Sequence, residues 1–326
     1  MRLASIGTSW ITASFIDAAL TVDGIDYVGC YSRDIDKARA FVNKFGDNIF
    51  CTNSLDELLQ TDIDAVYIAS PNFLHYKHAK ICLENNKNVI CEKPLAVNPS
   101  EITELQALAK SKGLVYMEAI MALHIDELEI LKNAMNTIGK ITSAHLDFSQ
   151  LSSKYKLITE DYTPNIFNPE MATGCLMDIG VYNVYLAIEL FGVPDKIISD
   201  CYFMQTGSDS HGTAIFNYSD KQVTLNFSKV GQSHGYSQIF GDEGTILIPS
   251  ISQLHDMKVI YNDNREVILS GEENRQYVMS GEARSLKNFI ENPEKYNEKY
   301  RHSLEMSVLV SNAMKEIREQ NPKFSF

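Results

Sequence analysis

The groups best suited to proton chemistry in this chain are a lysine and a carboxylate–phenol pair far from it in sequence. Lys93 follows the strand-like run 88–92 and precedes a proline, which fixes the backbone behind it. Asp178 and Tyr182 are four residues apart, so in a helix they would project from one face. Ammonium, carboxylate and phenol groups can all take part in proton transfer. A helix-capping aspartate and a core tyrosine would show the same spacing, so the pair alone leaves both interpretations open.

The first 120 residues must position Lys93, and they alternate between strand-like and helix-like segments. This order is typical of a parallel, doubly wound sheet, in which ligands bind outside the carboxyl ends of the strands. The strand-like runs lie at residues 2–7, 26–32, 64–70, 88–92 and 114–119. Four residues end or directly follow these runs: Gly7, Ser32, Ser70 and Lys93. We therefore expect these residues at one crevice.

The texture of the sequence changes after Glu118. Strand-like runs joined by short polar turns begin near Lys140, which indicates a mainly antiparallel sheet with one face covered. Two helical segments, 281–292 and 303–320, close the chain. The sequence thus predicts an α/β protein with two domains. Residues 1–120 would form a doubly wound dinucleotide-binding (Rossmann) domain, and residues 121–326 an α+β domain on a large open sheet.

Composition excludes several function classes. The 326 residues carry a net charge of −13, which disfavours nucleic acid as a partner. No apolar run approaches the ~20 residues that span a bilayer, so no membrane partner is expected. Six scattered cysteines without a C-x-x-C pair suggest reduced thiols rather than disulfides or a metal site. We expect a cytoplasmic protein without a bound metal.

The segment IGTSWIT lies where a dinucleotide-binding loop would be. Gly7 fits the first glycine of that fingerprint, whereas Ser9 and Thr12 stand at the places of the second and third. Both residues are small, and a hydroxyl can donate to phosphate. The loop alone fits any strand–turn–helix about equally well. The residues expected to contact a cofactor here are Gly7, Thr8, Ser9, Trp10 and Ile11.

The end of the next strand reads the adenosine ribose in such folds. An acidic residue there would favour NAD, but this chain has Ser32 and Arg33, with Lys37 one turn later. A hydroxyl and two cations suit a 2′-phosphate, so NADP is the expected cofactor, with NAD as the alternative. Asp34 is expected to cap the helix. The two cations could also belong to a solvated helix face.

Six segments together resemble the glucose-fructose oxidoreductase and inositol dehydrogenase family, Gfo/Idh/MocA. They are IGTSWIT, YSRDIDKARAFVNKFG, IASPNFLHYKHA, CEKPLAVN, MEA and GCLMDIGVYNVYLAIELFG, in the family's order. They cover about the first 120 residues and the region 170–192. The chain is most similar to the NADP-linked sugar oxidoreductases and dihydrodiol dehydrogenases, because they carry tyrosine where inositol dehydrogenases carry histidine.

The resemblance implies more than the residues themselves establish. Lys93 and Tyr182 would meet at the nicotinamide with Asp178 nearby, and the Lys93–Pro94 bond would be cis. The cofactor would be lined by Ser70, Pro71, Asn72, His75 and Glu92. The open sheet often mediates dimers in this family, so a homodimer or a dimer of dimers is expected.

Alcohol oxidation fits these residues. It removes a hydride from carbon and a proton from oxygen, and the proton needs a general base. A phenol has a pKa near ~10, which a neighbouring ammonium lowers. We therefore expect an NADP-dependent dehydrogenase or reductase acting on a small sugar, polyol or diol. Whether Lys93 or Tyr182 transfers the proton stays open.

One segment departs from the family pattern, and two other functions remain. The segment MEAIMALHIDEL lacks the Arg-Phe-x-Pro type sequence, which leaves the substrate side open; His124 within it is expected at the surface or at a helix start. A catalytically idle dinucleotide sensor is one alternative, disfavoured by the intact Lys93, Asp178 and Tyr182. A glycosidase that uses tightly held NAD is another, disfavoured by Ser32 and Arg33.

Overall fold

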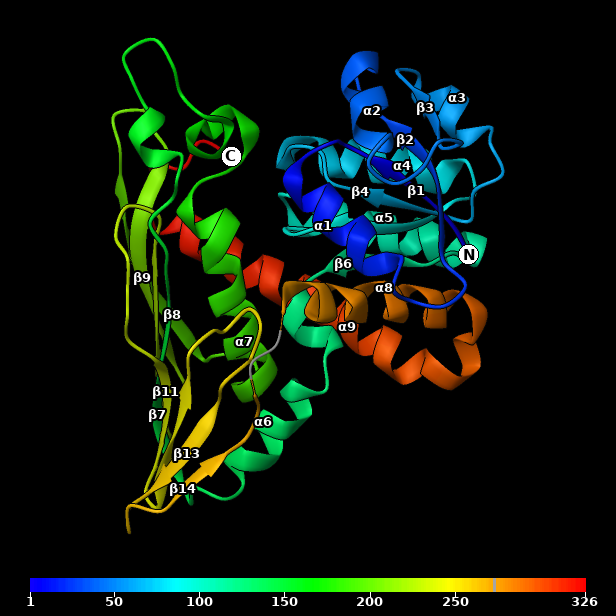
Figure 1. Cartoon of the computed structure of the whole chain (residues 1–326). Coiled ribbons are helices and arrows are strands. Elements are labelled where there is room, and N and C mark those ends of the chain that lie inside the picture. Colours follow the sequence, from blue (N-terminus) through cyan, green and yellow to red (C-terminus); the bar gives the residue numbers. More distant parts are fainter. Residues whose placement is uncertain (272–273) are drawn as a thin grey trace. The chain divides into compact units, whose positions relative to one another are not determined.

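The computed structural model describes residues 1–271 and 274–326. The chain forms two compact units, Met1–His124 with Asn274–Ser307 and Ile125–Glu273 with Val308–Phe326 (Figure 1). The sequence indicated a single boundary near residue 120. It did not predict that residues 274–307 return to the first unit.

A parallel sheet forms the core of the first unit. Its strands are β1 (Arg2–Ile6), β2 (Asp26–Tyr31), β3 (Phe50–Thr52), β4 (Ala65–Ile68), β5 (Asn88–Glu92) and β6 (Tyr116–Ala119). They lie in the order β3-β2-β1-β4-β5-β6 and every pairing is parallel, which confirms the predicted doubly wound sheet. Only the short β3 was not predicted. The strand order reverses between β1 and β4, where such sheets open a crevice for ligands.

Helices cover this sheet, and their caps follow local sequence rules. They are α1 (Trp10–Ala19), α2 (Ile35–Val42), α3 (Leu55–Leu59), η1 (Asn72–Leu74), α4 (His75–Glu84), α5 (Pro99–Lys112), η2 (Met121–His124), α8 (Arg275–Glu291) and the first part of α9 (Pro293–Glu319). Ser54 caps α3, because its hydroxyl accepts from the Glu57 N–H. Helix α5 begins after Asn98, which forms a capping box with Glu101.

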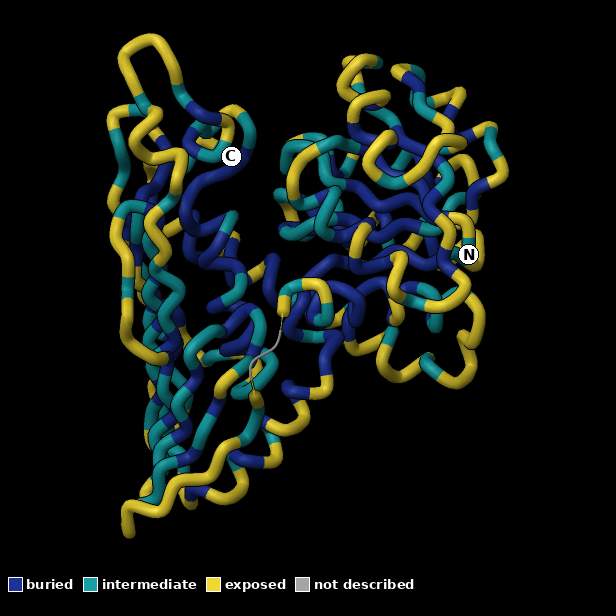
Figure 2. The backbone as a smooth tube through the Cα atoms, viewed as in Figure 1, coloured by how far each residue is buried: buried dark blue, intermediate teal, exposed yellow. Residues whose placement is uncertain are grey.

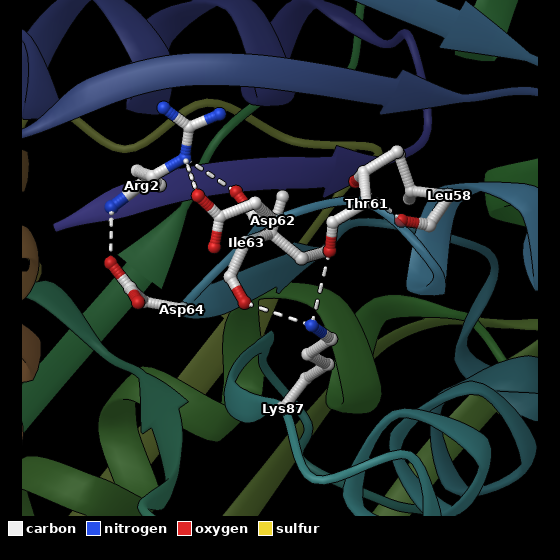
Figure 3. A network of polar contacts seen from close by, with 7 residues as sticks. All are labelled: Arg2, Leu58, Thr61, Asp62, Ile63, Asp64 and Lys87. Atoms are coloured by element: carbon white, nitrogen blue, oxygen red, sulfur yellow. Dashed lines mark hydrogen bonds and ion pairs between the residues drawn. The ribbon is translucent and has the colours of Figure 1, made fainter.

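A polar network ties together the amino ends of three neighbouring strands (Figure 3). The Arg2 N–H donates to Asp64 Oδ2 at 2.7 Å, and the Arg2 guanidinium pairs with Asp62 at 3.3 Å. Lys87 Nζ donates to the Ile63 carbonyl at 3.0 Å. These contacts lie at the amino ends of the strands, whereas ligands would bind at the carboxyl ends. They therefore belong to the scaffold, and the exposed ion pair among them adds little stability.

The second unit is built on a larger mixed sheet. Its strands are β7 (Ile141–Ser149), β8 (Lys196–Phe203), β9 (Asp209–Asn217), β10 (Gln222–Ser228), β11 (Ser237–Gly241), β12 (Gly244–Ile248), β13 (Lys258–Tyr261) and β14 (Glu266–Ile268). Their order is β14-β13-β12-β11-β7-β10-β9-β8. Strands β7 and β10 pair in parallel and all other neighbours are antiparallel. The predicted mainly antiparallel sheet is confirmed.

Helices pack on one face of the second sheet. The helical segments are α6 (Glu127–Met135), η3 (Tyr155–Leu157), η4 (Asn165–Phe167), η5 (Pro169–Met171), the π-helical turn η6 (Leu176–Gly180), α7 (Val181–Phe191) and the last part of α9. Burial alternates along β10, where Val223, Leu225 and Phe227 are buried beneath α7 and η6. Figure 2 shows buried and less buried segments next to one another in the second sheet. The stretch Pro169–Phe191 is long and apolar enough to cross a membrane. However, 72% of its most apolar window is buried, as in a core helix.

Candidate functional site

Gly7 forms the tight turn between β1 and α1. Its φ is +113°, and a Cβ at this position would lie 2.7 Å from the carbonyl oxygen of Ala69 at the end of β4. Only glycine combines this backbone conformation with this close approach. Gly7 therefore brings the first loop against the switch point of the sheet, as the dinucleotide fingerprint requires.

Two hydroxyls stand at the places of the other fingerprint glycines. Ser9 caps α1, and its Oγ lies 3.0 Å from Thr12 Oγ1 and 3.4 Å from the Thr12 N–H. Thr12 is fully buried, so its side chain packs inside the turn. The loop thus keeps a helix N-terminus, whose partial positive charge suits a pyrophosphate. Thr8 and Ile11 are half-buried beside it, and the Trp10 ring is exposed.

Two cations follow β2, and they differ in whether a carboxylate of the chain lies beside them. Asp34 caps α2 as predicted, since it accepts from the Asp36 and Lys37 N–H groups. Lys37 Nζ also lies 3.5 Å from the Asp34 carboxylate, so part of its charge is already neutralised. Arg33 is exposed, and Ser32 is half-buried and accepts from the Asp34 N–H at 3.3 Å. Arg33 is therefore the stronger candidate for a 2′-phosphate.

His75 joins the loops that follow β4 and β5. The imidazole is 1% exposed, and its two nitrogens lie 2.7 Å from the Ser70 carbonyl and 2.8 Å from the Pro94 carbonyl. Burial lowers the pKa of His75, and the charge of Lys93 lowers it further, whereas the two carbonyls act in the opposite direction. The His75 ring thus lies between the two loops and contacts one carbonyl of each. Pro71 and Asn72 lie half-buried where η1 begins.

Lys93 directly follows β5, and its bond to Pro94 is cis, as the family resemblance implied. Glu92, the last residue of β5, accepts a 2.5 Å hydrogen bond from the hydroxyl of Tyr67. Tyr67 is fully buried and stacks on Phe15 of α1 with ring centroids 3.9 Å apart. Glu92 of β5 is thus held in place by Tyr67 of β4, which in turn packs on Phe15 of α1.

Asp178 and Tyr182 lie in the second unit, on consecutive turns of one helical segment. Asp178 belongs to the π-helical turn η6, and Tyr182 to the first turn of α7. Both side chains are half-buried. The Tyr182 ring contacts Phe148 of β7 edge to face, at 5.6 Å between centroids. The predicted helix is present, although no sequence pattern indicated that it begins with a π-helical turn.

Lys229 is a polar residue of this region that sequence reasoning missed. It directly follows β10, is 7% exposed and forms an ion pair with Asp178 through Nζ. The only hint in the sequence is a lysine at the end of an alternating strand, which usually indicates a solvated side chain. The position is recognisable only once β10 is placed beneath η6.

His124 corrects an expectation. The sequence suggested a surface or helix-start histidine, but His124 is 4% exposed at the end of η2 and bonds Ser285 of α8 at 3.0 Å. Burial lowers the pKa of His124 to about 3, so the ring is neutral at physiological pH. It is a core residue of the first unit. The correction follows from the return of α8 to this unit.

The arrangement can do two things chemically. The first unit gathers Gly7, Arg33, Ser70 and Lys93 at the carboxyl edge of its sheet, which suits a dinucleotide. The second unit offers a carboxylate and a phenol within one turn, which suits hydroxyl recognition and proton transfer. Among the described residues, no group of three or more His, Cys, Asp or Glu side chains could hold a metal ion.

The comparisons with known proteins define the class. Residues 1–120 match the oxidoreductase family with an NAD-binding Rossmann fold, and residues 133–247 match the GFO/IDH/MocA C-terminal domain. The chain belongs to the Gfo/Idh/MocA family of NAD(P)-binding oxidoreductases.

Several individual proteins are similar to this chain. The chain is 36% identical over 266 residues to scyllo-inositol 2-dehydrogenase (NADP(+)) IolU of Bacillus subtilis, covering 81% of each chain. It is 29% identical over 252 residues to trans-1,2-dihydrobenzene-1,2-diol dehydrogenase of Xenopus laevis, covering 74% of this chain and 73% of that one. The 3-ketoreductase KijD10 of Actinomadura kijaniata, solved with NADP and TDP-benzene, shares the fold with a TM-score of 0.83. That match covers 98% and 97% of the two chains at 20% identity.

Proposed function

We propose that this protein is an NADP(H)-dependent oxidoreductase that interconverts a secondary alcohol and a carbonyl on a small polyol, sugar or diol. The observation that carries the proposal is Lys93 at the carboxyl end of β5, in the same loop cluster as Ser70 and His75. Relatives named for inositol and dihydrodiol oxidation support the substrate class.

The first unit fits a dinucleotide. Gly7 makes the tight turn of the fingerprint, because a Cβ at this position would meet the backbone of Ala69. The N-terminus of α1 follows directly. The exposed Arg33 guanidinium at the end of β2 supports NADP over NAD, because it can bond a 2′-phosphate bidentately.

When bound, the nicotinamide supplies or accepts the hydride, which is the cofactor's own chemistry. In this proposal the Lys93 ammonium bonds the substrate oxygen and stabilises the negative charge that develops there during reduction. Tyr182 donates the proton to that oxygen, or takes it during oxidation. Asp178 accepts a hydrogen bond from a second substrate hydroxyl and so orients the ring or chain.

A substrate screen with matched variants tests the proposal. The panel comprises inositols, other polyols, aldoses and diols, each with both cofactors. Lys93→Met should abolish turnover and leave cofactor titration measurable. Tyr182→Phe should lower kcat about 10²- to 10⁴-fold and change the pH–rate profile. Tyr185→Phe makes the same change at a core position of α7 and should leave turnover intact.

The same experiment distinguishes the other functions. Dinucleotide binding without turnover on any substrate would point to a sensor. Release of a sugar from a glycoside with bound NAD would point to a glycosidase. A fully active Lys93→Met variant would end the proposed role of that lysine, and an unchanged pH–rate profile in Tyr182→Phe would remove the phenol from the proton path.

We also propose that a second copy of the chain covers the outer face of the second sheet. Ile198 and Tyr202 of β8 are 46% and 65% exposed there and lie four residues apart on one face of the strand, so a partner would bury both. Native mass spectrometry should show a dimer or a dimer of dimers. Ile198→Lys should shift the population toward the monomer, whereas a monomeric wild-type protein would refute the proposal.

A further inference from the structure

Lys229 places an ammonium group inside the second unit. Its backbone N–H donates to the Ser210 carbonyl at 2.9 Å, and its side chain is 9% exposed and paired with Asp178. Burying an ammonium costs several kcal/mol unless an anion compensates it. The Asp178 carboxylate compensates this cost, so the buried ammonium and the carboxylate must stay together.

Asp209 contributes a second carboxyl to the same region. It is the first residue of β9, is 1% exposed, and accepts the Leu176 N–H through Oδ2 at 2.6 Å. Its Oδ1 has no hydrogen-bond partner within residues 1–271 and 274–326. Burial raises the pKa of Asp209 to about 7, and the charge of Lys229 acts in the opposite direction. Asp209 therefore ionises less readily than an ordinary aspartate.

Gly174 shows that the backbone is shaped around this carboxyl. A Cβ at residue 174 would lie 1.8 Å from Asp209 Oδ1, and the φ of Gly174 is +137°. A residue with a side chain would be strained here in backbone and in space. The turn that leads into η6 thus accommodates the carboxyl closely.

The charged group is therefore small and well defined. It consists of the Lys229 ammonium, directly after β10, and the carboxyls of Asp178 in η6 and Asp209 in β9. The thiols of Cys175 and Cys201 face Asp209, and burial raises the pKa of both, so they stay uncharged. The ammonium pairs with Asp178, and its charge also acts on the Asp209 carboxyl.

We propose that Lys229 is a positioning residue for the reaction: its ammonium, whose charge also acts on Asp209, holds the Asp178 carboxylate charged and oriented on the helix that carries Tyr182. The inference rests on the proposed function. An Asp178 that is held charged can only accept hydrogen bonds, so the ligand must offer a hydroxyl to it. A compound without a hydroxyl at that place would bind weakly.

A double-mutant cycle tests this role. Lys229→Met should lower kcat/KM about 10²-fold in the wild-type background, since a misoriented group costs about this much. In an Asp178→Asn background the same change should cost less than about 3-fold, because residues that act as a unit are not additive. Equal losses in both backgrounds would overturn the proposal.

Matched variants separate positioning from folding. Lys132→Met breaks another ion pair of the second unit, to Glu189 at 2.7 Å, and should combine additively with Asp178→Asn. Lys229→Arg keeps the charge and should retain activity within about 10-fold. If Lys229→Met does not fold, Lys229→Gln replaces it in the cycle, with thermal unfolding as the check.

A carboxyl titration decides the arrangement without any turnover. With ¹³C-labelled aspartate, the Asp209 signal should titrate near pH 7 in the wild-type protein and at higher pH in Lys229→Met. An unchanged midpoint would overturn the action of the Lys229 charge on Asp209. A wild-type protein that turns over no substrate but shows this shift would refute the proposed function while supporting the Lys229–Asp209 arrangement.

Discussion

Arg33 and Lys37 look alike in sequence, but their surroundings differ. Lys37 lies 3.5 Å from the carboxylate that caps its own helix, whereas Arg33 is exposed at the strand end. A cation that already has an anion gains less from a second one. We therefore expect Arg33 to contribute more than Lys37 to the binding of a 2′-phosphate.

Arg33→Ala should weaken NADPH binding about 10- to 100-fold and leave NADH binding nearly unchanged, since a charge-assisted hydrogen bond contributes about 1.5–3 kcal/mol. Lys37→Ala should have a smaller effect on NADPH. Fluorescence titration with both cofactors measures the difference. Equal losses for NADPH and NADH in Arg33→Ala would contradict the assignment of a 2′-phosphate site.

Gly7→Ala should destabilise the protein by about 1–3 kcal/mol and abolish cofactor binding, because the methyl group would meet the Ala69 carbonyl in a strained backbone conformation. Gly113→Ala is the control: Gly113 has a φ of +67°, but a Cβ there meets nothing within 4 Å. It should cost only about 1 kcal/mol and leave binding intact. Thermal unfolding and titration compare the two, and equal behaviour would show that the clash is unimportant.

At the scale of elements, α8 supplies a buried carboxyl to the first unit. Glu282 is 1% exposed, and its Oε2 has no hydrogen-bond partner in the described chain. Burial raises the pKa of Glu282 well above its ordinary value, and the charge of Glu92 adds to this, while Arg275 opposes it. The native state therefore holds a proton that the unfolded chain releases at lower pH.

The sign of the pH dependence follows. The contribution of Glu282 to stability is complete below the unfolded pKa, near ~4.5, and is lost as the pH rises toward the folded value. Glu282→Gln removes this loss, so the variant should gain stability relative to wild type between pH 5 and pH 8. Glu104→Gln, at an exposed carboxyl whose pKa Lys80 lowers, should show no such gain. Thermal unfolding at both pH values decides, and parallel curves for Glu282→Gln and wild type would contradict the prediction.

At the scale of the whole molecule, the first unit is assembled from two stretches of chain. Helix α8 packs on α1 and buries five apolar side chains, each at most 3% exposed. They are Val278, Met279, Ala283, Leu286 and Phe289. Each large side chain contributes about 1.5–3 kcal/mol when buried. A domain cut after residue 124 would lack this part of its core.

Residues 1–124 alone should therefore unfold without a cooperative transition and bind no NADPH. The same residues joined to 274–307 through a flexible linker should unfold cooperatively and bind the cofactor. Circular dichroism during heating and cofactor titration compare the two chains. A stable, binding-competent 1–124 fragment would show that α8 is dispensable for the first unit.

Local sequence patterns determined much of this protein. The helix cap at Asp34, the strand at 88–92 and the turn at Gly7 depend on near neighbours in the chain, and all are present as predicted. The spacing of Asp178 and Tyr182 indicated a helix for the same reason. The quoted motifs also sufficed to recognise the family.

Only the tertiary structure decided which charges are buried and beside what. Lys229, Asp209 and Glu282 look like ordinary surface residues in the sequence, and His124 was expected near the surface. Their environments arise where β9 and β10 pass beneath η6 and where α8 returns after about 150 intervening residues. Burial and pKa depend on neighbours that are distant in the chain, and no local pattern records them.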